Sequence, residues 1–237
     1  MTIWFITPAF GRLELSAVCF DQRLHVMATL QEHGIRTRCV VVADDGNLDL
    51  ARDRKFDVVV QNNEWLGRRF NDGIEYACLN GASRVVPIGS DSWIDPAYFL
   101  PLPNRRETYT SGLYAVVEAN RMAEINVTTV NGAGPYVFAR EALRSTRFRP
   151  AKDEIKRGVD RSTINGIRYR LRWQRHDVHP FQYIGFRHPP LLTPYQTLVD
   201  VWGVREHTEP WDILAKVYPT DLVLRARTIM QSQAVAA

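Results

Sequence analysis

Polar, turn-forming residues follow each apolar run in the first half of this sequence. The first run is followed by Thr7-Pro8-Ala9-Phe10-Gly11-Arg12, the second by Asp44-Asp45-Gly46-Asn47, the third by Asn62-Asn63 and the fourth by Gly89-Ser90-Asp91-Ser92. In an open parallel sheet, ligands bind beyond the carboxyl ends of the strands. We therefore expect these ends to meet at one crevice, which would collect Arg12, Asp44, Asp45, Arg69, Asn71 and Asp91.

This set of carboxylates, arginines and amides suits a nucleotide diphosphate bound together with a metal ion. Asp44 or Asp45, directly after a strand, can accept hydrogen bonds from a base N–H or a ribose hydroxyl. Asp91 offers hard oxygens to Mg²⁺ or Mn²⁺, ions that take one or two carboxylates and complete their shell with water and phosphate oxygens. Arginines nearby can add bidentate phosphate contacts.

Each of these residues also has a structural interpretation. Residues 44–47 are turn formers. Ser90-Asp91 could cap a helix that starts near Pro96, and Asn71 could pack inside a helix. Their order and spacing together favour the ligand site over these separate roles.

The elements that must position these side chains alternate between two periodicities. Short Val-rich runs predict strands buried on both faces, and amphipathic stretches predict helices between them. We expect strands at 3–7, 38–43, 57–61 and 84–89, and helices at 15–30 and 66–79. This alternation predicts an α/β fold with a mostly parallel, Rossmann-like sheet flanked by helices.

The second half is less regular and predicts a smaller mixed sheet. We expect strands at 108–118, 135–139 and 181–186, and helices at 159–171, 211–218 and 220–231. The chain has 237 residues, which suits one α/β domain. We predict a single domain over 1–237, with a donor-binding half at 1–100 and an acceptor-binding half at 101–237.

Composition indicates a soluble globular protein with a basic balance. The net charge is +4 and the pI is about 9.1, which favours contact with phosphates of a sugar nucleotide or of nucleic acid. The Arg-rich stretch at 140–175 holds much of the excess, and a solvated basic face is an equal alternative. Three cysteines without metal-type spacing, no signal peptide and no membrane-length apolar run predict a cytoplasmic protein, in a bacterium or a phage-infected cell.

Residues 2–100 resemble the family 2 glycosyltransferases of the GT-A fold. That family reads strand-TPxxxR, strand-DDGS, LG-x-x-x-N-x-G-I-x-x-A and hydrophobic-D-x-D-D with a Pro four residues on. The matching stretches here are Thr7 to Arg12, Val41 to Asn47, Leu66 to Ala77 and Ile88 to Pro96. The Gly-Ser-Asp variant at 89–91 is similar to glycosyltransferases in bacteriophage genomes.

The resemblance implies a GT-A fold and a role for each matched residue. Asp91 would bind the metal, and the residues implied at the donor are Thr7, Pro8, Arg12, Asp44, Asp45, Asn71 and Ser90. Two departures stand out. Gly89 replaces the first acid of D-x-D, and Phe70 replaces an arginine for which Arg68 or Arg69 would substitute.

The match is thinner in the second half, where the acceptor and the general base are expected. Residues 156–162 are similar to the place where such enzymes put a carboxylate at a helix start. We predict Asp160 as the base, with Asp153 and Glu154 as alternatives. The structural interpretation of Asp160 is a plain helix cap. Arg187 would bind the diphosphate and His188 would be a second metal ligand, unless His188 is an ordinary surface or core histidine.

We therefore predict a metal-dependent glycosyltransferase that uses a nucleotide-diphosphate sugar, expected to be a UDP-sugar, and inverts the anomeric centre. Its acceptor could be hydroxylated DNA, a protein or a glycan. A sugar nucleotidylyltransferase of the same fold is one rival, although the loop after the first strand has a single glycine. A non-catalytic nucleic-acid-binding protein is another, although no recognition-helix signature is present.

Overall fold

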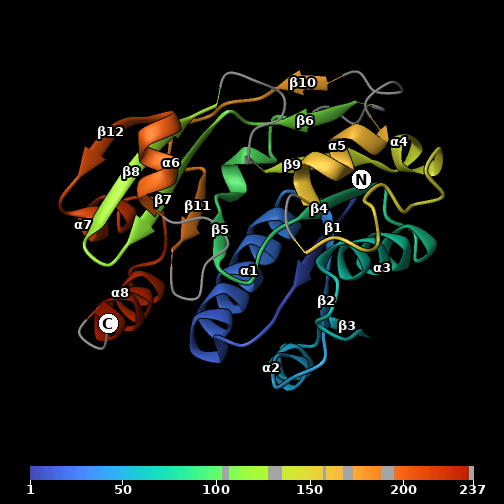
Figure 1. Cartoon of the computed structure of the whole chain (residues 1–237), viewed down its shortest axis with the longest axis horizontal. Helices are drawn as coiled ribbons and strands as arrows, with labels where there is room; N and C mark the ends of the chain where they lie inside the picture. Colours follow the sequence, from blue (N-terminus) through green and yellow to red (C-terminus); the bar gives the residue numbers. More distant parts are fainter. Residues whose placement is uncertain (103–106, 128–134, 157–158, 168–172, 188–194, 235–237) are drawn as a thin grey trace.

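The Val-rich runs of the first half form the parallel side of a large sheet, from β4 to the edge strand β3 (Figure 1). The computed structural model describes residues 1–102, 107–127, 135–156, 159–167, 173–187 and 195–234. Within these residues, a seven-stranded sheet has the order β10-β6-β9-β4-β1-β2-β3. Strands β1, β2, β3 and β4 are parallel, and β9 runs antiparallel to β4 and β6. The bounds are β1 Thr2–Pro8, β2 Arg36–Ala43, β3 Asp57–Val60, β4 Arg84–Pro87, β6 Thr108–Thr110, β9 Tyr136–Ala139 and β10 Trp173–Arg175.

Both faces of this sheet are covered, which explains the continuous apolar runs. Successive side chains of a strand point to opposite faces. Ile3 and Phe5 of β1 therefore pack with helix α1 (Leu13–Glu32), whereas Trp4 and Ile6 pack with helix α3 (Leu66–Leu79). The short helices α2 (Asn47–Asp53), α4 (Arg140–Arg144) and α5 (Val159–Ile167) complete this part.

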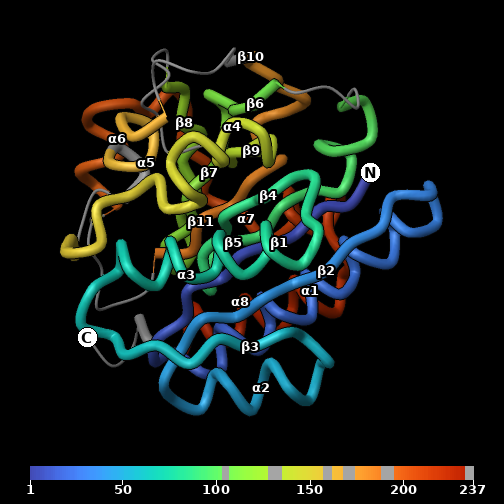
Figure 2. Tube along the Cα trace, turned by 90° about the vertical axis from the view of Figure 1, so that its right-hand side faces the viewer, coloured from blue at the N-terminus to red at the C-terminus, as the bar shows by residue number. Residues whose placement is uncertain are grey.

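A second, mixed sheet packs against the other side of α1. Its described strands have the order β12-β8-β7-β11-β5. Leu15, Val18 and Cys19 of α1 share a core cluster with this sheet, and α8 lies alongside α1 (Figure 2). The remaining bounds are β5 Ser92–Ile94, η1 Pro96–Tyr98, β7 Leu113–Glu118, β8 Arg121–Asn126, β11 Tyr183–Phe186, α6 Tyr195–Trp202, β12 Gly203–His207, α7 Pro210–Leu214 and α8 Thr220–Ala234.

The fold class predicted from the sequence is confirmed, and so are the first-half helices and strands. The single strand expected at 108–118 is wrong. Residues 111–112 break it, because Ser111 Oγ and Gly112 N both donate to Asp177 Oδ1 (2.6 and 3.0 Å), and β6 and β7 then join different sheets.

Two further expectations are corrected. Residues 90–91 do not cap the helix near Pro96, because Asp95 accepts a hydrogen bond from Ala97 N (2.8 Å) and caps η1. The helix expected at 211–218 ends at Leu214. The last residues of the helix expected at 159–171 lie outside the described part. No helix in the described residues is long and apolar enough to cross a membrane.

Candidate functional site

Direct contacts join the loops that follow the parallel strands. Gly11 N, after β1, donates to Asp45 Oδ2 after β2 at 2.6 Å, and Asn63 N, after β3, donates to Asp44 Oδ2 at 3.0 Å. Arg12 Nη1 forms an ion pair of 2.9 Å with Asp91 Oδ2, at the turn between β4 and β5. The predicted convergence of four strand ends is therefore present. The adjacent residues Gly11 and Arg12 make the contacts to Asp45 and Asp91, respectively.

The loop after β1 has an unusual backbone that places Arg12. Gly11 and Arg12 both have left-handed φ values, 56° and 45°. Glycine adopts this region freely, whereas a residue with a side chain does so at a cost. Arg12 also stands at the N-terminal boundary of α1 and makes no side-chain cap. From this position the guanidinium pairs with Asp91 and does not cap the helix.

Asp91 is positioned by a residue that lacks a side chain. A Cβ built on Gly89 would overlap Asp91 Oδ1, so the Asp91 carboxylate fills the space that the first acid of a D-x-D sequence would need. Oδ1 also accepts a hydrogen bond from Ser92 Oγ at 3.1 Å. The replacement of the first acid by Gly89 thus has a geometric consequence, because the Asp91 carboxylate occupies the space beside residue 89.

Helix α1 holds the strand that follows Asp91. β5 is an edge strand of the second sheet. Gln22 Nε2 donates to Ile94 O at 2.7 Å, and Arg23 Nη2 donates to Ser92 O at 3.4 Å. Both side chains are buried, and the burial lowers the pKa of Arg23. These contacts satisfy edge carbonyls that would otherwise be buried without a donor.

Asp45 is held as a charged acceptor. Partial burial raises the pKa of its carboxyl, but hydrogen bonds from Gly11 N, Asn47 N and Asn47 Nδ2 outweigh this and lower the pKa below the ordinary 3.8. Asn47 Nδ2 also donates to Gly11 O at 3.1 Å. The loops after β1 and β2 are therefore locked together by reciprocal hydrogen bonds.

Four of the predicted donor-binding side chains are inside the protein. Their exposed fractions are 1% for Thr7, 2% for Arg69, 0% for Asn71 and 2% for Ser90. Arg69 donates to Val42 O at 2.9 Å and also bonds Ala9 O and Asn63, and burial lowers its pKa. Arg69 therefore joins the loops after β1 and β3 to the end of β2. Pro8 is half-buried at the end of β1.

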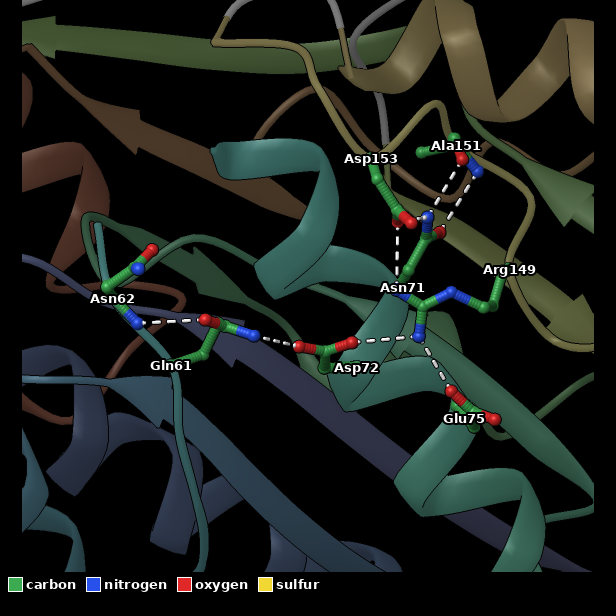
Figure 3. A network of polar contacts seen from close by, with 8 residues as sticks. All are labelled: Gln61, Asn62, Asn71, Asp72, Glu75, Arg149, Ala151 and Asp153. Carbon is green, nitrogen blue, oxygen red and sulfur yellow. Dashed lines mark hydrogen bonds and ion pairs between the residues drawn. The ribbon is translucent and has the colours of Figure 1, made fainter. Parts of the chain in front are cut away.

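The asparagine of the LG-x-x-x-N stretch ties α3 to a distant segment (Figure 3). Asn71 Nδ2 donates to Ala151 O (2.8 Å) and to Asp153 Oδ1 (2.7 Å), and its Oδ1 accepts from Ala151 N (3.0 Å). The first amides of the helix are occupied too. Gly67 N donates to Ile155 O and Arg68 N to Asp153 O, each at 3.0 Å.

Arg149 extends this connection along α3, as Figure 3 shows. Its guanidinium pairs with Asp72 (2.8 Å), Glu75 (2.7 Å) and Asp153 (2.9 Å). Gln61, after β3, donates to the other oxygen of Asp72 at 2.5 Å. The sequence interpretation missed this cluster. The Arg-rich composition of 140–175 was its only signal, since Asp72 and Glu75 lie 77 and 74 positions before Arg149.

The 149–155 segment leads into α5, which carries the predicted base. Asp160 lies in the first turn of α5, and its side chain is outside the described part. Asp153 is a poor alternative base. Partial burial raises its pKa, but the bonds to Asn71 and Arg149 outweigh this and lower it. Glu154 is exposed.

Arg187 directly follows β11, the strand that pairs with β5, and Asp91 directly precedes β5. Its neighbour Phe186 donates its N–H to Asp91 O at 2.8 Å, and Arg187 N donates to Val117 O at 2.7 Å. The Arg187 Nε is buried and has no hydrogen-bond partner among the described residues. A guanidinium in this state is suited to an anionic ligand. His188, the predicted second metal ligand, lies outside the described residues.

The fit of a divalent ion can be judged from the donors around Asp91. Within the described ranges, no group of three or more His, Cys, Asp or Glu side chains could hold a metal. Asp91 supplies one partly exposed carboxylate, with 22% of its side chain exposed, and its Oδ2 pairs with the Arg12 guanidinium in this structure. This fits the type of Mg²⁺ or Mn²⁺ site that takes one carboxylate, waters and phosphate oxygens.

A surface groove of about 700 Å³ lies at the opposite end of the sheet. It is lined by Thr2, Arg36 and Arg38 at the amino ends of β1 and β2 and by residues at the C-terminal ends of α1 and α3. Its lining contains no carboxylate. We place the candidate site at the carboxyl ends, where the acidic and basic side chains meet and where open α/β sheets bind ligands.

Comparisons with known proteins show the fold. No protein-family model and no curated protein matches the sequence. A crystal structure of an S. aureus TarS fragment is similar with a TM-score of 0.56 and 12% identity, over 78% of this chain and 60% of that one. A longer TarS structure gives 0.56 and 13%, over 80% and 37%.

The chain thus spans 60% or less of the TarS chains that it matches. The Drosophila β-1,4-galactosyltransferase 7, in complex with manganese, UDP-Gal and xylobiose, is more distant, with a TM-score of 0.45, 10% identity and coverage of 76% and 67%. The α/β architecture is that of the GT-A class of folds. At these identities the likeness concerns the fold and not the activity.

Proposed function

We propose that the protein is a glycosyltransferase that moves a sugar from a nucleotide diphosphate to an acceptor hydroxyl. One observation carries the proposal. In a GT-A fold, Asp91, Arg12 and the Asp44–Asp45 pair come together through direct contacts between loops at the carboxyl ends of the parallel strands. Carboxylates for a ribose or base and a cation for a diphosphate are then together at the edge of the sheet where open α/β folds bind ligands.

The donor is held by the exposed members of this group. Asp44 is exposed and Asp45 is half-buried, so both can accept hydrogen bonds from the nucleoside. Phe10 is 52% exposed, which is unusual for a large apolar ring, and it stands in the same loop as Arg12. We propose that this ring stacks on a flat part of the donor. Arg12 and Arg187 contact the diphosphate.

A divalent ion, Mn²⁺ or Mg²⁺, would neutralise the charge that develops on the departing diphosphate. Asp91 would hold it, with phosphate oxygens and waters as the other ligands. Gly89 leaves the room in which the Asp91 carboxylate rests, and Ser92 orients its second oxygen. Arg187, whose Nε has no hydrogen-bond partner among the described residues, would add positive charge for the diphosphate.

Asp160 removes the proton of the acceptor hydroxyl in this proposal. Its position at the start of α5 is set by the 149–155 segment, which Asn71 and Arg149 fasten to α3. A carboxylate base facing the anomeric carbon opposite the diphosphate gives inversion. The acceptor belongs to the class of hydroxyl compounds that includes modified DNA, protein and glycan chains. The net charge of +4 favours an acidic one.

The first experiment is a thermal-shift panel of nucleoside diphosphates and UDP-sugars, each with and without Mn²⁺. A ligand that binds only the native state raises the melting temperature by mass action. We expect one nucleotide to give a shift that Asp91→Asn reduces and that Asp49→Asn leaves unchanged. Asp49 is a matched control because it is an aspartate on the surface helix α2, with a 78% exposed side chain.

Hydrolysis of the matching sugar nucleotide in the absence of an acceptor then tests the chemistry. Tight, salt-sensitive DNA binding without any response to nucleotides would instead support a nucleic-acid-binding protein. A shift with nucleoside triphosphate and sugar phosphate together, and none with the sugar nucleotide, would support a nucleotidylyltransferase.

A further inference from the structure

The carboxylate proposed as the metal ligand already carries a cation from its own chain. Arg12 Nη1 lies 2.9 Å from Asp91 Oδ2, and the two side chains are 21% and 22% exposed. The pair is therefore neither fully solvated nor sealed in the core. A third group can reach it, and its charges are only partly screened by water.

Both carboxylate oxygens of Asp91 already have one partner each, and one of these partners is a cation. Oδ2 is occupied by Arg12, and Oδ1 accepts from Ser92 Oγ while resting against Gly89. A divalent ion bound at Oδ2 would stand next to the guanidinium and be repelled by it. Metal binding at Asp91 is therefore weakened as long as Arg12 stays paired with it.

A diphosphate supplies the reason for Arg12 to leave. Its oxygens match the fork of guanidinium donors better than a single carboxylate oxygen does. The Arg12 side chain projects from a backbone that is already fixed, by the left-handed φ of 45° and by the Gly11–Asp45 bond. The guanidinium can turn from Asp91 to a phosphate by rotation about its side-chain bonds, without a change in the loop.

We propose that Arg12 is an internal counterion that lowers the affinity of Asp91 for divalent metal until a diphosphate arrives. Nucleotide binding and metal binding are then coupled. The diphosphate draws Arg12 away, and the freed carboxylate and the phosphate oxygens hold the ion together. This inference rests on the proposed function, because it takes Asp91 as the metal ligand. By linkage, the metal must strengthen nucleotide binding by the same factor.

The test measures Mn²⁺ binding to the whole protein from the signal of free Mn²⁺ in electron paramagnetic resonance, with and without UDP. Fits use free-ion concentrations, so that chelation by UDP in solution is accounted for. The variants are Arg12→Gln, Arg12→Lys, Asp91→Asn and the double variant of Arg12→Gln with Asp91→Asn. Arg36→Gln, an exposed arginine at the opposite end of the sheet, is the matched control.

We expect Arg12→Gln to raise the affinity of the nucleotide-free protein for Mn²⁺ about fivefold, the upper range for a partly exposed pair. The coupling between UDP and Mn²⁺ should fall by a similar factor. Arg12→Lys retains the positive charge and should stay near the wild type, as should Arg36→Gln. The double variant should lose the gain, because the ion then has no carboxylate to bind.

Two results separate the inference from the function beneath it. If Asp91→Asn weakens Mn²⁺ binding in the presence of UDP but Arg12→Gln leaves the nucleotide-free affinity unchanged, the counterion role is refuted and the metal site stands. If Asp91→Asn has no effect with UDP present, the metal assignment fails and the counterion role fails with it. Arg12→Met, with no charge and a similar length, repeats the measurement should Arg12→Gln not fold.

Discussion

Replacing Asn71 by alanine should destabilise the protein far more than its helix position suggests. The side chain is fully buried and makes hydrogen bonds of 2.8 and 3.0 Å to the backbone of Ala151 and of 2.7 Å to Asp153. Alanine would leave both the N–H and the C=O of Ala151 without these partners. Each unsatisfied buried group costs about 1–3 kcal/mol, so we expect a loss of roughly 3 kcal/mol in the free energy of unfolding.

Urea denaturation followed by circular dichroism measures this loss. For a chain of this size, roughly 3 kcal/mol corresponds to a fall in Tm of about 6–12 °C. Asn80→Ala is the matched control. Asn80 ends the same helix, is exposed, and makes one bond of 2.8 Å to Tyr76 O. We expect the control to change stability by no more than about 0.5 kcal/mol.

An Asn71→Ala variant as stable as the control would refute this reasoning. It would mean that the 149–155 segment is held by its other contacts, chiefly the Arg149 ion pairs and the bonds to the α3 amides. A change in the denaturant slope would show that the substitution alters the compactness of the denatured or native state, or breaks two-state unfolding, and the loss would then not measure the Asn71 contacts alone.

Four other substitutions test separate parts of the site. Asp160→Asn should lower kcat by about 100-fold or more with little change in donor affinity, measured by steady-state kinetics and calorimetry, and equal losses in both would indicate a structural role. Gly67→Ala places a Cβ against Lys152 O, so it should displace the segment before α5 and reduce kcat and Tm together. Phe10→Ala should weaken donor binding about tenfold without lowering Tm, and unchanged binding would exclude the ring as a stacking surface. Asp45 has a pKa below 3.8, so its stabilising effect is present above pH 3.8 and is lost as the pH falls through the folded-state value; Asp45→Asn should therefore flatten the decline in stability between about pH 5 and pH 2 in urea titrations.

The sequence determined the centre of the fold because local patterns carry that information. Val-rich runs with Asp, Asn or Gly at their ends predict buried parallel strands and the edge at which a ligand binds, and those rules concern neighbours in the chain. The meeting of Arg12, Asp45 and Asp91 followed from the topology that the pattern implies. The second half lacked such runs, and the break at 111–112 depends on Asp177, far along the chain.

The tertiary structure decided which of the expected residues are buried and which remain exposed at the strand ends. Thr7, Arg69, Asn71 and Ser90 have the same polar character as Asp44 or Arg12, yet they are buried, and Arg69 and Asn71 bond backbone and neighbouring side chains. Composition cannot separate the two groups, because a hydrogen bond to a ligand and a hydrogen bond to a distant carbonyl need the same chemical group. The packing of the 149–155 segment onto α3 places Asn71 inside the protein, and the ion pair with Asp91 places Arg12 at the strand ends. Both placements depend on contacts between distant parts of the chain.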